Sequence, residues 1–365
     1  PHHSGAAYTG TQELVLGAGA TLGIAVQVLI LIPFLRRAGV HFRPRYDFRN
    51  SGLGHTLRLG IWTVLFVVVN QVAYTVVVRL ASGGTARAGC GHGGGAHEAT
   101  GYTVYSGAFL FVMVPHAIIT VSLATAILPR LSGKAADGDL AGLAGTLAET
   151  LRTALAVVVP FALLLPVLSY DTAKVLFGYG ATATTFDHYV PSMILFGPGI
   201  VLFTFHYLML RGFYALERTR TVFYIQCAIA VTNIVVAVVL VHRATAEQTS
   251  PALVLAYSAS YLVGSLVSYT MLGSQLGGLR GNELMRFLVR LLIAALVATG
   301  VTWGLGEILP GSDHAASHLV AGLRVVVLGV VDLAVFVALA KVMRLREVTD
   351  VIDVIVRRIP GTHAS

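Results

Sequence analysis

The sequence predicts an all-α polytopic membrane protein with nine transmembrane helices, and three observations carry this prediction. Apolar residues make up 56% of the 365 residues and charged residues only 12%, whereas soluble domains carry roughly 25% charged residues. The mean hydropathy is +0.78. Apolar stretches of about 20 residues, the length that crosses roughly 30 Å of hydrocarbon, recur along the chain. Together these observations exclude a soluble enzyme and a secreted scaffold.

Each apolar stretch is expected to be a helix, because a helix satisfies its own backbone hydrogen bonds inside hydrocarbon. The nine expected spans cover approximately residues 13–35, 58–81, 102–128, 152–169, 189–210, 219–241, 252–272, 284–306 and 318–342.

The basic residues predict the orientation of these spans. Twenty of the 25 Lys and Arg residues lie on one side, in the loops after alternate spans and in the tail. Loops rich in Lys and Arg are cytoplasmic, so the amino end is expected outside and the carboxyl end inside. The same alternation explains the net charge of +8 without nucleic acid as a partner.

Three segments between or after the spans have their own character. Residues 82–101 are glycine-rich and are expected to form a flexible external loop, and their Cys90, His92, His97 and Glu98 match no zinc spacing. Leucines at intervals of three and four residues predict an amphipathic helix over 139–151, and a similar stripe predicts another in the tail. An interfacial anchor is the favoured interpretation of both helices, with binding of a partner as the alternative.

Polar side chains at membrane depth are candidates for a substrate cavity, because burying them in hydrocarbon is costly. The candidates are Arg79, Asn70, Gln71, His116 and Asn233. Each also has a structural interpretation. The amides more often form hydrogen bonds between helices than line a cavity. A buried core histidine is equally typical of His116, and a side chain that reaches the outer headgroups is equally typical of Arg79.

Prolines and glycines within the spans predict bends. Pro115 lies near the centre of the third span, and Pro198 lies between two glycines in the fifth. Because proline removes one backbone hydrogen bond, a helix is expected to bend or break at both positions. Asp332 in the last span is expected to face the bundle, with Arg324 as a candidate partner. Several bent helices with polar groups at midplane are typical of a transporter.

Two sequence motifs resemble those of one family. The third span ends in Leu-Pro-Arg-Leu-Ser at 128–132, and the fifth continues into Arg-Gly-Phe-Tyr-Ala-Leu-Glu-Arg-Thr-Arg-Thr at 211–221. Both resemble the MurJ/MviN family of lipid II flippases, as do Leu-Phe-Gly-Tyr-Gly at 176–180 and Asn233. The similarity covers about residues 14–345.

The resemblance implies a fourteen-helix, two-lobe transporter. A chain that starts with Pro1 and has its amino end outside is then expected to be the later part of such a protein, with five helices before it. Residues 1–50 would hold the last helix of the first lobe and a cytoplasmic loop, 51–277 the second six-helix lobe, 278–345 two additional helices that form a groove for a lipid tail, and 346–365 a cytoplasmic amphipathic tail.

The resemblance also implies a function. The protein would move undecaprenyl-pyrophosphate-linked peptidoglycan precursor from the inner to the outer leaflet of the bacterial plasma membrane by alternating access. This activity serves cell-wall biogenesis and cell shape without enzymatic chemistry, cofactor or metal. The candidates for a gate or hinge are Pro115, Pro198, Arg211, Gly212, Glu217, Arg218 and Arg220.

This sequence departs from the family pattern at several positions. Family members often carry an Arg and a Glu where Leu110 and Met113 stand here, and some have acidic sodium ligands where this chain offers Asn70 and Asn233. A sodium site is therefore not expected.

Two other functions remain open. The protein could export another polyprenyl-linked glycan or a drug cation, or it could be a scaffold for cell-wall synthesis proteins that transports nothing. The expected partners are the lipid-linked precursor, membrane lipids and, less directly, cell-wall synthesis proteins.

Overall fold

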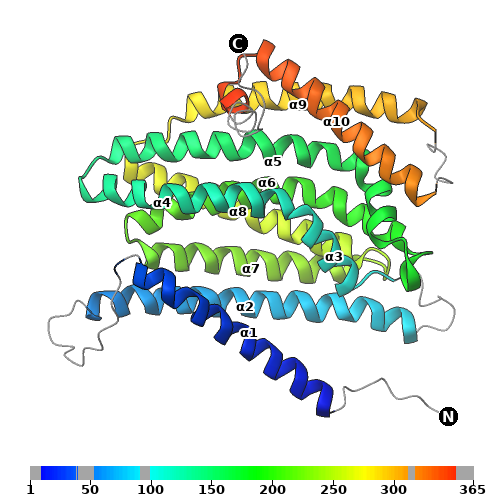
Figure 1. Ribbon diagram of the computed structural model, residues 1–365, viewed down its shortest axis with the longest axis horizontal. Helices are drawn as coiled ribbons and strands as arrows, with labels where there is room; N and C mark the ends of the chain where they lie inside the picture. Colours follow the sequence, from blue (N-terminus) through cyan, green and yellow to red (C-terminus); the bar gives the residue numbers. More distant parts are fainter. Residues whose placement is uncertain (1–9, 38, 40–52, 91–98, 311–316, 351–365) are drawn as a thin grey trace. The chain divides into compact units, whose positions relative to one another are not determined.

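The computed structural model describes residues 10–37, 39, 53–90, 99–310 and 317–350. This part of the chain consists of helices joined by short turns and contains no strand. The chain divides into two compact units, Pro1–Thr56 and Leu57–Ser365. Helix α1 (Gly10–Arg37) belongs to the first unit. The second unit holds nearly all of α2 and the helices after it, which run alongside one another in Figure 1.

The described residues contain nine helices that are long and apolar enough to cross a membrane, as the sequence predicts. Charges are sparse within them, so the chain is a multi-pass membrane protein. The helices after α1 are α2 (Leu53–Cys90), α3 (Tyr102–Val112), the π-helical turn η1 (His116–Thr120), α4 (Val121–Ala136), α5 (Leu140–Phe177), α6 (Tyr189–Ala215), α7 (Thr219–Arg243), α8 (Thr249–Leu276), α9 (Gly281–Ile308) and α10 (His318–Val342).

The two expected bends have different outcomes. The third span is interrupted just before Pro115: α3 ends at Val112, and the π-helical turn η1 begins directly after Pro115 and leads into α4. By contrast, α6 continues through Pro198, so the helix does not break there. The flanking glycines instead allow close packing. A Cβ atom on Gly197 would lie 2.9 Å from the carbonyl oxygen of Ala162 on α5, and one on Gly199 would lie 2.7 Å from Ser258 Oγ on α8.

The segment 139–151 is not a separate helix on the membrane surface. It forms the first turns of α5, a helix of 38 residues. Leu143, Leu147 and Leu151 are at most 1% exposed, because α4, α6 and α9 pack around this end of α5. Their spacing therefore marks a face buried against protein, and the interfacial anchor expected here is wrong. Asp139 caps the helix by accepting a hydrogen bond from the Gly142 N–H over 2.8 Å.

Two hydrophobic clusters hold the second unit together. One joins α4, α5 and α6 to α9 and α10, and the other joins α3 to α5, α6 and α8. Helix α6 lies between α5 and α8 and contacts both extensively. The beginning of the tail continues the first cluster, since Leu345 and Val348 are buried in it. Residues 351–365, which hold the rest of the predicted tail stripe, lie outside the described residues, as do His92, His97 and Glu98.

Candidate functional site

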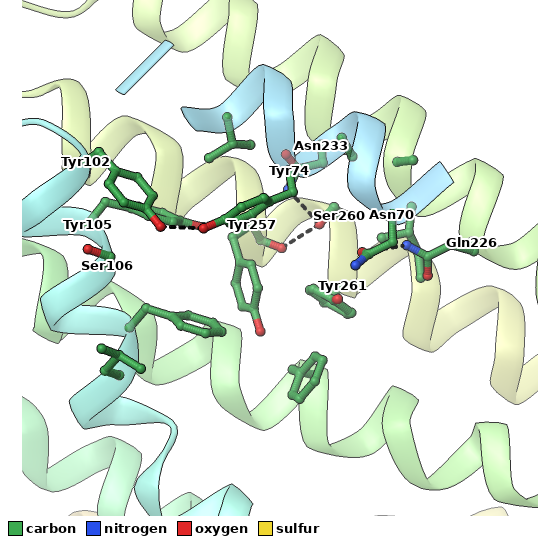
Figure 2. Close-up of a pocket in the computed structure, with 17 residues that line it drawn as sticks. Asn70, Tyr74, Tyr102, Tyr105, Ser106, Gln226, Asn233, Tyr257, Ser260 and Tyr261 are labelled. Carbon is green, nitrogen blue, oxygen red and sulfur yellow. Dashed lines mark hydrogen bonds between the residues drawn. The ribbon is translucent and has the colours of Figure 1, made fainter. Parts of the chain in front are cut away.

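The second unit contains an open cavity of about 460 Å³ between helices of the bundle. Five helices form its walls, and Figure 2 shows the polar side chains that they direct towards it. Hydroxyl, amide and aromatic groups line the cavity, and no Asp, Glu, Lys, Arg or His is among the lining residues described. These are Asn70, Ala73, Tyr74 and Val77 of α2; Tyr102, Tyr105, Ser106, Phe109 and Leu110 of α3; Phe203 of α6; Gln226, Ile229, Ala230 and Asn233 of α7; and Tyr257, Ser260 and Tyr261 of α8.

Two hydrogen bonds donated by side-chain amides lie on one side of this cavity. Gln226 Nε2 donates to Asn70 Oδ1 over 3.2 Å and so links α7 to α2. Asn233 Nδ2 donates to Ser260 Oγ over 3.4 Å and links α7 to α8 (Figure 2). The Oδ1 atom of Asn233 is buried and accepts no hydrogen bond from the described part of the chain. A buried acceptor without a donor costs free energy, so this atom is suited to accept a hydrogen bond from a bound molecule.

Tyrosines form much of the remaining wall. Tyr74 and Tyr102 share a hydrogen bond between their hydroxyl groups, which links α2 to α3 (Figure 2). The rings of Tyr257 and Tyr261 lie 4.7 Å apart, and the buried hydroxyl of Tyr257 has no partner among the described residues. Aromatic faces beside hydroxyl and amide groups are suited to a molecule that is polar but uncharged.

A second, smaller cavity of about 260 Å³ adjoins the first. The two share Asn70, Phe203, Gln226 and Tyr261 in their linings. Unlike the larger cavity, the smaller one has two ionisable residues in its lining, Arg211 and His206. The His206 ring is buried, and its Nδ1 atom lies 3.0 Å from Ser268 Oγ.

The five predicted cavity residues have different positions. Asn70 and Asn233 line the larger cavity together. Gln71 and Arg79 are exposed on α2 and are not among the lining residues. His116 is 4% exposed and packs in the core, with Nδ1 2.8 Å from Thr204 Oγ1 and its ring 4.6 Å from that of Phe203. It therefore occupies the position of a satisfied core histidine.

The predicted gate residues gather at the turn between α6 and α7, apart from the two prolines. Gly212 lies against α8, where a Cβ atom would meet Leu272 at 2.7 Å. Glu217 adopts a left-handed backbone conformation with φ 55°, which closes the turn. Glu217, Arg218 and Arg220 line a surface hollow with Arg58. Arg220 lies 5.5 Å from the centre of the Trp62 ring, a cation–π distance.

The tyrosines that line the cavity are not among the site residues predicted from the sequence. Tyr102, Tyr105 and Ser106 follow one helix face at intervals of three and four residues, as do Tyr257 and Tyr261. Hydroxyl groups that share one helix face within an apolar span are the sequence pattern that could have predicted this part of the cavity wall.

The pairing considered for Asp332 is also wrong. Asp332 accepts a hydrogen bond from Thr302 Oγ1 over 3.3 Å, whereas Arg324 pairs with Asp171 of α5. Asp332 lies at the edge of an apolar hollow of about 490 Å³ between α5 and α10.

Comparison with known proteins gives a consistent result. The family model for the lipid II flippase MurJ matches residues 5–321. The chain is 28% identical over 213 residues to a probable lipid II flippase MurJ of Vibrio cholerae, covering 57% of this chain and 38% of that protein. It is 26% identical over 220 residues to the probable MurJ of Haemophilus influenzae, covering 57% of this chain and 40% of the relative. It is 25% identical over 248 residues to the probable MurJ of Thermotoga maritima, covering 68% of this chain and 46% of that protein.

The fold agrees with these matches. A solved structure of the lipid II flippase MurJ in an inward closed conformation superposes with a TM-score of 0.58 at 16% identity, over 82% of this chain and 56% of that one. The chain thus spans less than half of the length of each of the three curated relatives. The family model covers most of the chain, and the helical bundle has the same fold. The chain belongs to the MurJ family of lipid II flippases.

Proposed function

We propose that this chain takes part in moving lipid II, the undecaprenyl-pyrophosphate-linked disaccharide-pentapeptide, from the inner to the outer leaflet. Family membership supports the substrate. The observation that carries the proposal is the cavity of about 460 Å³ lined by tyrosines and amides inside a membrane-spanning bundle. A sugar or peptide group needs such a polar route, because hydrocarbon offers its hydroxyl and amide groups no hydrogen-bond partner.

The apolar hollow between α5 and α10 complements this cavity. Its lining is almost entirely hydrocarbon, with Asp332 at the edge. A polyprenyl tail loses nothing by staying in lipid or in such a hollow, since both are apolar. The proposed division is therefore a polar head group inside the bundle and a tail along its outer face. Export of a drug cation is less well supported, because a carboxylate would be expected in its cavity, and none lines the cavity described.

The proposal includes an orientation and a division of the chain. The arginine-rich turn between α6 and α7 would be cytoplasmic, as would the carboxyl end, and the amino end would lie outside. Residues 51–277 would form the second lobe, 278–345 the additional helix pair and 346–365 a cytoplasmic tail. Cell-wall synthesis proteins would contact these cytoplasmic segments.

Depletion in the bacterium that makes this protein tests the proposed function. Lipid II should accumulate in the inner leaflet, and the cells should lyse. Normal lipid II in the outer leaflet of depleted cells that have no second flippase would refute the proposal.

A matched pair of variants tests the cavity itself. Asn233→Leu should impair growth complementation at normal membrane abundance, because it removes the unpartnered acceptor. Asn282→Leu, on the exposed surface of α9, should complement fully. Equal growth of the two variants would remove the cavity from the mechanism.

A further inference from the structure

Arg211 differs from the other half-buried arginines of the described residues. Arg152 forms ion pairs with Glu283 and Glu347, and Arg324 forms one with Asp171. Arg211 is also half-buried, but none of the ion pairs found within the described part of the chain includes it. A partly buried cation without a counter-ion is costly, so its position requires an explanation.

Tyrosines hold the Arg211 guanidinium in a fixed position. Its carbon lies 4.3 Å from the centre of the Tyr207 ring and 5.9 Å from that of Tyr214. Its Nη2 atom donates a hydrogen bond to the Tyr207 hydroxyl. Tyr207 lies one turn earlier on the same helix, so the contact follows from the spacing of four residues. The guanidinium is therefore oriented before any ligand arrives.

Donor groups without an acceptor remain at this position. The Nε atom of Arg211 is buried and donates to no acceptor among the described residues. Because the Tyr207 hydroxyl accepts a hydrogen bond from Arg211, its own proton is free to be donated. Two donors beside a cavity of about 260 Å³ suit an anion with several oxygens, and the planar fork of arginine matches phosphate in particular.

The surroundings indicate what this phosphate would be attached to. The adjoining cavity of about 460 Å³ shares four lining residues with the smaller one and has no charged residue in its described lining. A ligand that fills both would carry its negative charge at Arg211 and an uncharged polar group among the tyrosines and amides. A phosphate ester of a sugar has this distribution of charge.

We propose that Arg211 and Tyr207 form a phosphate-binding subsite, which holds the pyrophosphate of a polyprenyl-linked sugar while the sugar lies in the adjoining cavity. The proposal rests on the proposed function for the identity of this substrate. The same chemistry could instead come from an anionic phospholipid headgroup or from free pyrophosphate, and the experiment separates these sources.

Binding to the full chain in phosphatidylcholine nanodiscs tests the subsite. The probes are undecaprenyl pyrophosphate, inorganic pyrophosphate and phosphatidylglycerol, measured by native mass spectrometry. Arg211→Gln should weaken binding of undecaprenyl pyrophosphate by roughly ten- to a hundredfold, the usual effect of losing hydrogen bonds to a charged group. Arg211→Lys should restore only part of the affinity, since an ammonium lacks the fork. Tyr207→Phe, which keeps the ring beneath the guanidinium, should give a smaller loss.

The matched control is Arg286→Gln, which removes an exposed arginine of α9 and should leave the affinity unchanged. Equal affinities of Arg211→Gln and Arg286→Gln for undecaprenyl pyrophosphate would overturn the proposal. A loss confined to phosphatidylglycerol, or to inorganic pyrophosphate, would also overturn it and assign Arg211 to that anion. Failure of the depletion experiment together with Arg211-dependent binding would refute the flippase function and leave the subsite standing. If depletion supports the flippase function but binding of undecaprenyl pyrophosphate does not depend on Arg211, the subsite is refuted and the proposed function stands.

Discussion

Arg324 of α10 and Asp171 of α5 form a buried ion pair, with Nε 3.0 Å from Oδ2 and the two side chains 12% and 8% exposed. The Nη1 atom of Arg324 also donates to the carbonyl oxygens of Gly306 and Leu309, each over 3.1 Å. One guanidinium thus joins α5 and α10 to the carboxyl end of α9. It satisfies carbonyl groups that a helix end leaves without partners.

Arg324→Ala should destabilise the protein by about 3–5 kcal/mol, because it leaves the Asp171 carboxylate buried without a partner. Thermal unfolding in detergent measures the change. The double variant Arg324→Met/Asp171→Leu should recover much of the loss, since no charge then remains buried. Arg243→Ala, at the exposed end of α7, is the control and should unfold like the parent. A single variant as stable as this control would contradict the prediction.

The cap of α5 should respond to acid. The hydrogen bond from the Gly142 N–H, and then Lys134 at 3.2 Å, lower the pKa of Asp139 below its ordinary value. Because the folded-state pKa is depressed, the stabilisation is complete above the ordinary pKa of about 4 and disappears as pH falls through the lower, folded value. The protection factor of the Gly142 amide, which compares its exchange rate with the intrinsic rate at the same pH, should therefore fall below about pH 4. Asp139→Asn keeps an acceptor without the charge. In this variant the protection factor of the Gly142 amide should show no fall in acid.

Two glycines of the helical bundle should respond in opposite ways to alanine. Gly197→Ala places a methyl group 2.9 Å from a backbone carbonyl oxygen of α5, which cannot move aside, and should cost about 1–3 kcal/mol. Gly133→Ala adds a methyl group with nothing within 4 Å and should stabilise α4 by up to about 1 kcal/mol. The difference in melting temperature between the two variants is the measurement. A more stable Gly197→Ala would show that α5 and α6 are less closely packed than described.

Arg79 should act as an outer-leaflet anchor. It lies nine residues beyond Asn70, about 13 Å further along the helix at 1.5 Å per residue. It is exposed and is not among the residues that line the cavity. Both Arg79→Lys and Arg79→Ala should therefore support growth, once normalised to membrane abundance. Impaired growth of the alanine variant at normal abundance, with only partial rescue by lysine, would instead indicate phosphate binding at this position.

The proposed orientation can be measured with single cysteines in a background that lacks Cys90 and Cys227. A cysteine at exposed Glu247, between α7 and α8, should react with an impermeant maleimide in intact cells. One at exposed Asp137, between α4 and α5, should react only after the cells are opened. The reverse pattern would invert the topology.

The sequence predicts the spans well because their length and apolarity are imposed by the bilayer. The break at Pro115 follows from a local rule. The burial of Leu147 does not, because a leucine stripe has the same spacing whether it faces lipid headgroups or another helix. The ion pair between Arg324 and Asp171 could not be predicted either, because the two residues lie on helices far apart in the sequence and only the packing of α10 against α5 brings them together. Among the residues that line the cavity, the sequence indicates Asn70 and Asn233. It does not single out Tyr257, because tyrosine is also common at membrane surfaces.

The three ion pairs on α5 have a mechanical consequence. Asp171 is tied to α10, and Arg152, nineteen residues earlier, is tied to Glu283 of α9 and Glu347 of the tail. At 1.5 Å per residue these attachments lie about 28 Å apart, nearly the thickness of the hydrocarbon layer. A rod fastened near both ends cannot tilt against its supports, so α5, α9 and α10 should behave as one rigid block. Any rocking motion within this unit must then take place on the far side of the tyrosine-lined cavity, where side-chain contacts link α2 to its neighbours.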